Sequence, residues 1–239
     1  MELILVRHGE PAWSDADGLA RNDPVLTDRG RAQARAVARR LAATEQVPEW
    51  GDIDRLLVSP AVRAQETAAP IAAALDLPIE TSDWLLELHN PPQWEGAPIE
   101  QVRVAFESMQ HADREVWWNG MPGGESPAAF HERVTAGLDA FLEGLGIRPA
   151  PDQPRLWDSD GPIDEEDHDR LVLVAHGGTN SVIVTHLLGL DHEPWDWFRF
   201  TMGHASIAQL DTVAIAGHHA WSLRALGDAN HLEVPDRTY

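Results

Sequence analysis

Two histidines in this sequence each follow a short apolar run. Residues 3–6 lead into Arg7 and His8, and residues 171–175 lead into His176. Apolar runs of this length are typical of buried parallel strands, and ligands bind where such strands end. An arginine beside an imidazole there indicates an anion site with a nucleophile or base. A single Arg-His pair is more often part of an ordinary polar loop, so it is the second run with its histidine that favours a site.

A third apolar run, residues 55–58, is followed by the start of a helix that carries Arg63. Arg7, Arg63 and His176 would together offer a tetrahedral dianion two planar guanidinium forks and an imidazole. Helix N-termini add partial positive charge. Phosphate is the natural occupant of such a site, and His8, placed between the cations, could attack phosphorus as a neutral imidazole.

Transfer of a phosphoryl group from an ester also needs a proton donor for the departing oxygen. Glu87 lies in the largely apolar stretch 84–88 and is our candidate for that role. The ordinary alternative is a solvated glutamate, because Glu87 is one of many carboxylates in the chain.

The elements that must position these residues alternate between strand and helix. Thr27 and Ser126 are plausible N-caps. This alternation predicts an α/β fold, a three-layer α/β/α sandwich around a mostly parallel, doubly wound sheet. Beyond the apolar runs, the expected elements are helices at 32–43, 61–75, 126–145 and 179–188, a short strand at 78–81, and edge strands at 206–213 and 220–226.

We expect one domain over residues 1–239, because no repeat and no clear boundary divides the chain. Residues 84–126 include a helical pattern with large aromatic side chains, which predicts a helical cap packed over the sheet edge. Residues 148–169 are rich in proline and acidic residues and poor in apolar ones, which predicts a solvated, mobile loop.

Composition excludes several classes of function. The formal net charge of −21 argues against nucleic acid as a partner, and it requires a local basic pocket for any anionic substrate. The absence of cysteine excludes disulfides and thiolate catalysis. No apolar run is long enough for a membrane span, and no cleavage signal is seen. We therefore expect a cytoplasmic monomer or homodimer that binds a small phosphorylated molecule and neither membrane nor nucleic acid.

Two other groups of residues invite a chemical interpretation. Asp158 and Asp160 stand in a D-x-D-G order like that of aspartyl-phosphate enzymes, but the preceding residues make a poor buried strand, so an acidic loop is favoured. The spacing of several further histidines fits no standard metal site, so surface or core positions are favoured. These histidines are His186, His192, His218 and His219.

Four motifs resemble those of the histidine phosphatase superfamily, which is also called phosphoglycerate mutase-like. They are ELILVRHGEP (2–11), SPAVRAQET (59–67), PGGES (122–126) and VAHGG (174–178). The resemblance covers residues 3 to about 210, with the motifs in the family's order.

The resemblance implies that His8 is the nucleophile and forms a phosphohistidine. It implies that Arg7, Arg63 and His176 hold the phosphoryl oxygens. Glu87, in a region that resembles the family's L-x-E…W-E-G block, would be the general acid and then the base for water. The resemblance implies no metal and no cofactor.

The chain also departs from the family pattern. Ser14 stands where many members, mutases especially, carry asparagine, and the spacing from Glu87 to Trp94 is one residue longer than usual. We expect a phosphatase acting on phosphomonoesters; the alternatives are a cofactor-dependent phosphoglycerate-type mutase and a non-catalytic protein that binds a phosphorylated ligand. The candidate substrate-binding residues are Ser14, Asn22 and Gly177.

Overall fold

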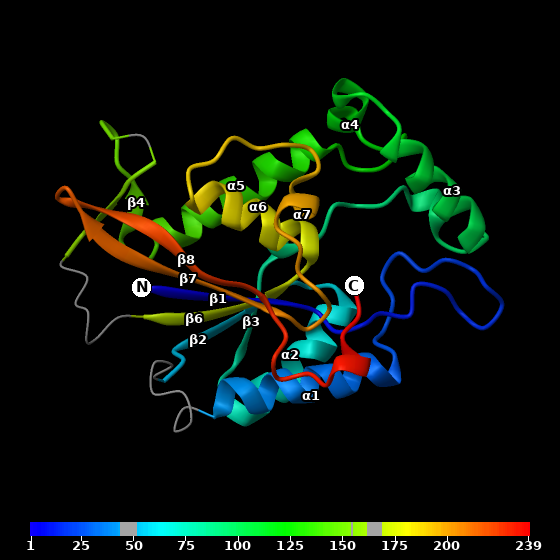
Figure 1. Cartoon of the computed structure of the whole chain (residues 1–239), viewed down its shortest axis with the longest axis horizontal. Helices are drawn as coiled ribbons and strands as arrows, with labels where there is room; N and C mark the ends of the chain where they lie inside the picture. Colours follow the sequence, from blue (N-terminus) through cyan, green and yellow to red (C-terminus); the bar gives the residue numbers. More distant parts are fainter. Residues whose placement is uncertain (44–51, 154, 162–168) are drawn as a thin grey trace.

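The computed structural model describes residues 1–43, 52–153, 155–161 and 169–239. In these residues eight strands form one sheet in the order β3-β2-β6-β1-β7-β8-β5-β4 (Figure 1). The strands are β1 (Glu2–Arg7), β2 (Arg55–Val58), β3 (Ile79–Thr81), β4 (Ile147–Pro149), β5 (Trp157–Ser159), β6 (Arg170–Ala175), β7 (Ile207–Ile215) and β8 (His218–Asp228).

The half of the sheet that carries the predicted site is parallel. β6 lies between β1 and β2 and pairs in parallel with both, so that Arg7 lies opposite Ala175. The backbone N–H of His8 continues this ladder by donating to the carbonyl of Ala175 at 2.9 Å. The residues that follow β1 and β6, His8 and His176, therefore leave the sheet side by side, as the two apolar runs predicted.

The other half of the sheet is antiparallel. β7 pairs with β1 and β8, and β5 and β4 extend the sheet beyond β8. The expected three-layer α/β fold is confirmed, but in the described residues the sheet is mixed and not mostly parallel, because three strand pairings are parallel and four are antiparallel. The prediction that 206–213 and 220–226 are edge strands is wrong, because β7 and β8 form a long hairpin in the sheet interior and β3 and β4 are the edges.

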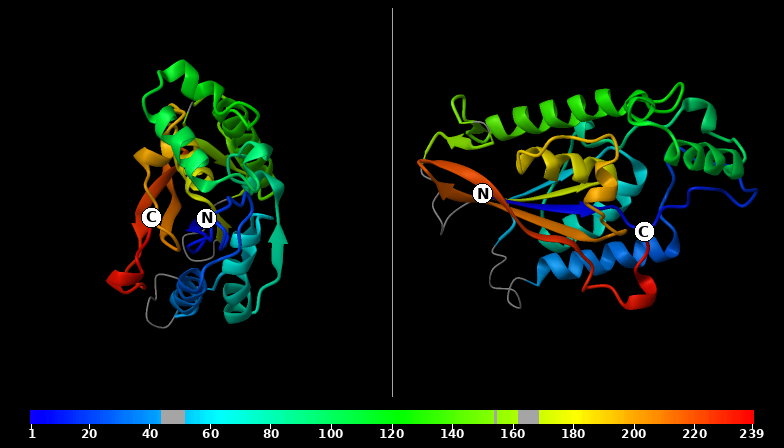
Figure 2. Two further views of the ribbon diagram at one scale, coloured as in Figure 1. Left: turned by 90° about the vertical axis from the view of Figure 1, so that its right-hand side faces the viewer. Right: turned by 45° about the horizontal axis from the view of Figure 1, so that its top comes forward.

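Helices cover both faces of the sheet (Figure 2). Alternate residues of β1 point to opposite faces: Leu3 and Leu5 belong to one apolar core, and Ile4 and Val6 to the other. The first core lies under α5 (Pro127–Glu143) and α6 (Gly177–Leu187), and the second lies against α1 (Asp28–Ala42) and α2 (Val62–Leu75).

Both predicted N-caps are confirmed. The side chain of Thr27 accepts from the backbone N–H of Gly30 at the start of α1, and that of Ser126 accepts from Ala129 at the start of α5. These bonds satisfy donors that a helix N-terminus would otherwise leave unpaired. They also fix where each helix leaves the loop before it.

The segment 148–169 differs from the predicted solvated loop. β4 and β5 lie at its start and middle, and Trp157 is only 3% exposed in the core under α5. The indole packs edge-on to the rings of Trp221 and His186. The high acidic content of the segment favoured a loop in the prediction. The strand forms nevertheless, because one large aromatic residue that packs in the core is enough to hold three residues on the sheet. Residues 154 and 162–168 of the segment lie outside the described residues.

The predicted cap segment, about 84–126, contains short turns of 3-10 helix and two α-helices. The helices are α3 (Ile99–Gln110) and α4 (Arg114–Asn119), and they lie towards the carboxyl ends of the parallel strands (Figure 1). A bridge between Leu19 and Pro98 joins the loop after β1 to the start of α3. A short helix after α6, α7 (Asp196–Arg199), packs against α6. Among the described helices, none is long and apolar enough to cross a membrane.

Candidate active site

His8 lies at the end of β1 with a ring that is fixed at one nitrogen. Its Nδ1 is 2.7 Å from the carbonyl oxygen of Gly9, and its Nε2 accepts from Arg63 Nε at 3.3 Å. A carbonyl can only accept a hydrogen bond, so Nδ1 carries the proton and Nε2 presents a lone pair. The side chain is 2% exposed. His8 is thus held in the tautomer that a nitrogen nucleophile needs.

The surroundings of His8 keep the imidazole neutral. Its pKa lies well below 6.5, first because burial penalises the charged form and then because His176, Arg63 and Arg7 would repel an added proton. The bond from Nδ1 to Gly9 opposes this shift. A lone pair is therefore present on Nε2 at neutral pH.

Arg63 approaches His8 from the first turn of α2. Its side chain is 6% exposed and lies with its guanidinium carbon 5.1 Å from the centre of the Trp13 ring, while Nη1 is 3.4 Å from a carboxylate oxygen of Asp23. The same oxygen accepts from the backbone N–H of Val62. Asp23 and Trp13 in the loop after β1 thus hold Arg63 in place while its Nε donates to the His8 ring.

His176 lies beside His8 at the end of β6. The two ring centres are 5.1 Å apart, and His176 Nε2 is 2.8 Å from the hydroxyl of Ser59. Its buried Nδ1 has no hydrogen-bond partner among the described residues. Burial, followed by the charges of Arg63 and Arg7, lowers the pKa of His176 well below 6.5. An imidazole nitrogen that is unpaired beside Arg7 and Arg63 is available to bond to a phosphoryl oxygen, if it carries the ring proton.

Arg7 reveals a residue that the sequence reasoning missed. Its Nη1 donates to the carbonyl of Met202, and its Nη2 donates to His204 Nε2 at 3.0 Å. Because arginine can only donate, His204 carries its proton on Nδ1, which is 3.0 Å from the hydroxyl of Thr238. Burial, then the charge of Arg7, lowers the pKa of His204 to about 3. His204 positions Arg7 as a neutral acceptor.

The turn that delivers His204 is strained. Ala205 has a left-handed backbone conformation with φ of 56°, and its N–H donates to the carbonyls of both Arg7 and His8. A non-glycine residue in this region costs roughly 1–3 kcal/mol, and such residues cluster at functional sites. The strain is sustained by bonds to the backbone of the two residues at the centre of the site.

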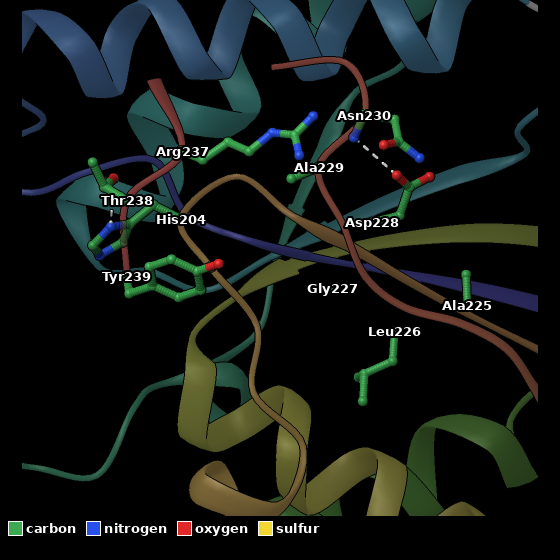
Figure 3. A pocket seen from close by; sticks show the side chains of 11 residues that line it. His204, Ala225, Leu226, Gly227, Asp228, Ala229, Asn230, Arg237, Thr238 and Tyr239 are labelled. Atoms are coloured by element: carbon green, nitrogen blue, oxygen red, sulfur yellow. Dashed lines mark hydrogen bonds between the residues drawn. The ribbon is translucent and has the colours of Figure 1, made fainter. Parts of the chain in front are cut away.

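A pocket of about 490 Å³ lies on the far side of His204, and Figure 3 shows the residues that line it. Arg237, Thr238 and Tyr239 form one wall, and Ala225–Asn230 form the other. His8, Arg63 and Glu87 do not line it. This pocket therefore meets the candidate site only through His204 and is not the place where the phosphoryl group would lie.

Glu87 faces the same centre from the start of the cap segment, between β3 and α3. Its Oε2 accepts from the backbone N–H of Gly178 at 2.8 Å, at the N-terminus of α6, and its Oε1 accepts from Leu88 at 2.9 Å. Glu87 raises the pKa of both Arg7 and Arg63, against the larger effect of burial on each. A Cβ on Gly178 would lie 2.4 Å from Oε1, so the carboxylate needs glycine at that position.

Arg133 on α5 holds the segment that carries Glu87. Its guanidinium donates to the carbonyls of Trp84, Leu86 and Glu87 at 3.1 to 3.3 Å. The same group forms a two-pronged pair with Glu125, at 2.9 and 2.8 Å. These bonds fix the backbone of Glu87 while its side chain reaches the helix N-terminus.

The structure also places the predicted substrate-binding residues. Gly177 lies against Arg7, since a Cβ there would be 3.5 Å from Arg7 Nε. Ser14 forms a bridge with Ala20 in the loop after β1, and Asn22 bonds to Glu95 and Pro91. Gly177 is therefore beside Arg7 at the centre of the site. Ser14 and Asn22 instead belong to the loop after β1, which also carries the residues that hold Arg63.

The D-x-D-G residues lie elsewhere. Asp158 pairs with His218 at 2.6 Å, and Asp160 pairs with Arg148 at 2.5 Å, on the strands at the far side of the sheet from β2. Neither carboxylate is paired with His8. The favoured interpretation as an acidic loop is only partly right, because Asp158 lies in β5 and is partly buried, whereas Asp160 follows that strand and is exposed.

Comparison with known proteins places this geometry in a family. The model of the histidine phosphatase superfamily (branch 1) matches residues 3–146. A curated relative, "Probable phosphoglycerate mutase GpmB" of Yersinia enterocolitica serotype O:8 / biotype 1B, is 30% identical over 244 residues, which cover 98% of this chain and 96% of the relative.

Solved structures share the fold. A mycobacterial glucosyl-3-phosphoglycerate phosphatase superposes with a TM-score of 0.67 at 24% identity, over 95% of this chain and 99% of that one. A phosphoserine phosphatase from Entamoeba histolytica gives a TM-score of 0.62 at 23% identity, over 97% and 99%. At this level of identity the two structures are evidence for the fold alone.

Proposed function

Because the chain belongs to branch 1 of the histidine phosphatase superfamily, we propose that it is a phosphomonoesterase that works through a phosphohistidine on His8. The observation that carries the proposal is the fixed tautomer of His8, whose unprotonated Nε2 lies at Arg63 in a site that also holds Arg7 and Glu87. Cations around a neutral nucleophile attract a dianion and leave the lone pair available.

In the first step His8 Nε2 attacks phosphorus and the bond from phosphorus to the ester oxygen breaks. Arg7, Arg63 and His176 donate hydrogen bonds to the three phosphoryl oxygens, whose charge they stabilise in the transition state. Glu87, protonated for this step, gives its proton to the departing alcohol oxygen. The products are a free alcohol and a phosphoryl group bonded to His8 Nε2.

In the second step Glu87, now a carboxylate, takes a proton from water as the water oxygen attacks phosphorus. The bond from His8 Nε2 to phosphorus breaks, and inorganic phosphate leaves. The acceptor geometry of both Glu87 oxygens, fixed by the backbone of Gly178 and Leu88, suits the carboxylate form that this step requires. His8 keeps its proton on Nδ1 throughout and donates it to the carbonyl oxygen of Gly9.

A mutase is the second candidate. The curated relative from Yersinia enterocolitica is named as a probable phosphoglycerate mutase, which supports this alternative. The two functions share the first step and differ in what accepts the phosphoryl group. In a mutase a second hydroxyl of the phosphoglycerate attacks in place of water, so phosphoglycerate isomers interconvert without net release of phosphate.

The test is to incubate the protein with a panel of phosphate esters and to follow both inorganic phosphate and isomer exchange. The panel contains 3-phosphoglycerate, phosphoserine, a glycosylated phosphoglycerate and p-nitrophenyl phosphate. We expect phosphate release to exceed exchange between 2- and 3-phosphoglycerate. Faster exchange that depends on 2,3-bisphosphoglycerate would establish the mutase, and neither activity with any ester would refute both.

A further inference from the structure

A second group of histidines, one buried and one partly exposed, lies apart from His8, between α5, α6 and α7. His131 is on α5, His192 is in the loop after α6, and Asp196 begins α7. Each offers one ligand atom, and the three atoms lie within 4.8 Å of one another. Asp196 shares a side-chain hydrogen bond with Thr185 in the last turn of α6. Thr185 lies about eight residues from the start of that helix, which Glu87 contacts, and this is roughly 12 Å along a helix.

His131 is the residue that needs explanation. Its side chain is 6% exposed, and neither ring nitrogen has a hydrogen-bond partner among the described residues. An imidazole has two polar nitrogens, and leaving either of them buried and unpaired lowers the stability of the folded protein. The His131 ring packs against the rings of Trp118, Phe130 and His192. These ring contacts do not give either nitrogen of His131 a hydrogen bond.

Asp196 and His192 place two further metal-ligand atoms near His131. Asp196 is fully buried, and its Oδ2 lies 3.3 Å from His192 Nδ1. Two ligand atoms bound at ~2.1 Å to one tetrahedral zinc ion lie about 3.4 Å apart, so this pair already has the separation of two ligands. The other oxygen of Asp196 accepts from Arg199 Nη1 at 2.9 Å and from the backbone N–H of Glu193 at 3.3 Å.

We propose that His131, His192 and Asp196 bind a divalent transition-metal ion, with zinc as the expected occupant. Two imidazoles and a carboxylate suit zinc and exclude magnesium and calcium, which prefer oxygen ligands. Arg199 would act from outside the metal's own ligands by orienting the carboxylate, as such partners do in known sites. The ion would tie α5 to α7 and the loop between α6 and α7.

This site is independent of the proposed reaction at His8, and its role is to stabilise one helical layer. The sequence pattern did not reveal it, because the interval of 61 residues from His131 to His192 has no standard metal-binding spacing. The three side chains come together because α5 packs against α6 and α6 packs against α7, an arrangement that Figure 1 shows for the backbone.

Zinc binding to chelator-treated full-length protein tests the proposal, measured by competition with a chromophoric chelator. We expect one zinc ion per chain. His131→Leu and His192→Ala should each lower the zinc affinity by at least about 100-fold, since loss of an outer partner alone often costs 10–100-fold. The matched control is His111→Ala, which removes an exposed histidine and should leave the affinity unchanged.

Thermal unfolding supplies a second readout that does not depend on enzymatic activity. Zinc at about 100 times its dissociation constant should raise the wild-type Tm by roughly 5–10 °C. His131→Leu should abolish that rise. In the metal-free state it should be at least as stable as wild type, because Leu removes two unpaired polar atoms.

Equal zinc affinity in wild type and in both ligand variants would overturn the proposal, as would a loss in His111→Ala as large as theirs. A metal-free His131→Leu protein that is much less stable than wild type would show that His131 has a structural bond of its own. His192→Ala, which alters a partly exposed side chain, keeps the affinity test valid in that case.

Discussion

Two clusters of histidines in this molecule differ in the charge of their neighbours, which is positive in one cluster and negative in the other. At the ends of β1 and β6, His8 and His176 face the guanidinium groups of Arg7 and Arg63. Between α5 and α7, His131 and His192 face the carboxylate of Asp196. Burial makes the imidazoles neutral in the first cluster and lowers the pKa of His131 in the second.

The comparison shows that burial sets the protonation state of a histidine. The charged neighbours of the histidine then decide whether its ligand is an anion or a cation. A neutral imidazole among cations can attack or bind an anion. A neutral imidazole beside a carboxylate can bind a cation, because the ring offers one nitrogen lone pair and the carboxylate offers a negatively charged oxygen. The predictions below are ordered from the largest expected effect to the smallest, and each would break or sharpen this contrast.

Glu87→Gln should slow phosphorylation of the enzyme by an alkyl phosphate by roughly 10²–10⁴-fold, because the alkoxide is a poor leaving group without a proton donor. p-Nitrophenyl phosphate should be affected far less in this step. Single-turnover kinetics with both esters provide the measurement.

Glu10→Gln is the matched control, since Glu10 bonds to Thr27 and Arg29 at the start of α1. It should affect both esters alike. Equal slowing of both esters by Glu87→Gln would assign the proton donor to another carboxylate.

Arg63→Lys should lower kcat/KM by roughly 10²–10³-fold, because lysine keeps the charge and loses the planar fork that binds two oxygens. Arg199→Lys, beside the second cluster, is the control and should leave kcat/KM within about twofold. A near wild-type rate for Arg63→Lys would place Arg63 outside the transition state.

Gly178→Ala should lower kcat by up to about 100-fold, because the added Cβ would lie 2.4 Å from Glu87 Oε1 and displace the carboxylate. The loss should again be greater for an alkyl ester than for p-nitrophenyl phosphate. In the control, Gly161→Ala, a Cβ meets nothing within 4 Å. If the two variants were equally active, the bond between Glu87 and the α6 N-terminus would be irrelevant to turnover.

Stability should fall as pH drops below about 6.5. Folded-state pKa values are depressed to about 4 for His131 and about 3 for His204, so the unfolded chain binds more protons than the folded one between those values and 6.5. For each pH unit that the pH falls within that window, each such group lowers the unfolding free energy by up to roughly 1.4 kcal/mol. Above pH 6.5 these groups make the unfolding free energy no more dependent on pH. Chemical denaturation of metal-free protein at pH 7, 6 and 5 measures this.

His131→Leu should reduce the slope of the unfolding free energy against pH between pH 6.5 and 4. At pH 8, above that window, the unfolding free energy of the variant should no longer change with pH through this residue. His111→Ala, with an exposed imidazole, should leave the slope as in wild type. If the slope were the same in His131→Leu, the histidine would be protonated when folded, and the contrast between the two clusters would fail.

The parts of the site that follow parallel strands could be predicted from sequence, because each apolar run ends at the residue that matters. Arg7, His8 and His176 are such residues. His204 is different: it lies before β7, and it reaches Arg7 because an antiparallel strand begins where its neighbour ends. A histidine just ahead of a predicted antiparallel partner of β1 is a signal that could have revealed it.

The rest depends on packing that leaves little trace in local sequence. Trp157 is surrounded by acidic and polar residues, yet its ring enters the core. Arg133 looks like a surface residue of a helix, yet it bonds to three backbone carbonyls around Glu87. Such contacts join segments far apart in the chain, and no periodicity of the helix or strand encodes them.

The central claim is that His8 Nε2 forms a bond to phosphorus, and rapid quenching tests it most directly. Wild type and Glu87→Gln are mixed with p-nitrophenyl phosphate, quenched in alkali within milliseconds, and the phosphorylated peptide is identified. We expect alkali-stable, acid-labile phosphate on Nε2 of His8, more abundant in Glu87→Gln because water is no longer activated, and none in His8→Ala. Phosphate on Nδ1, on serine or on aspartate, or phosphoenzyme in His8→Ala, would contradict the account.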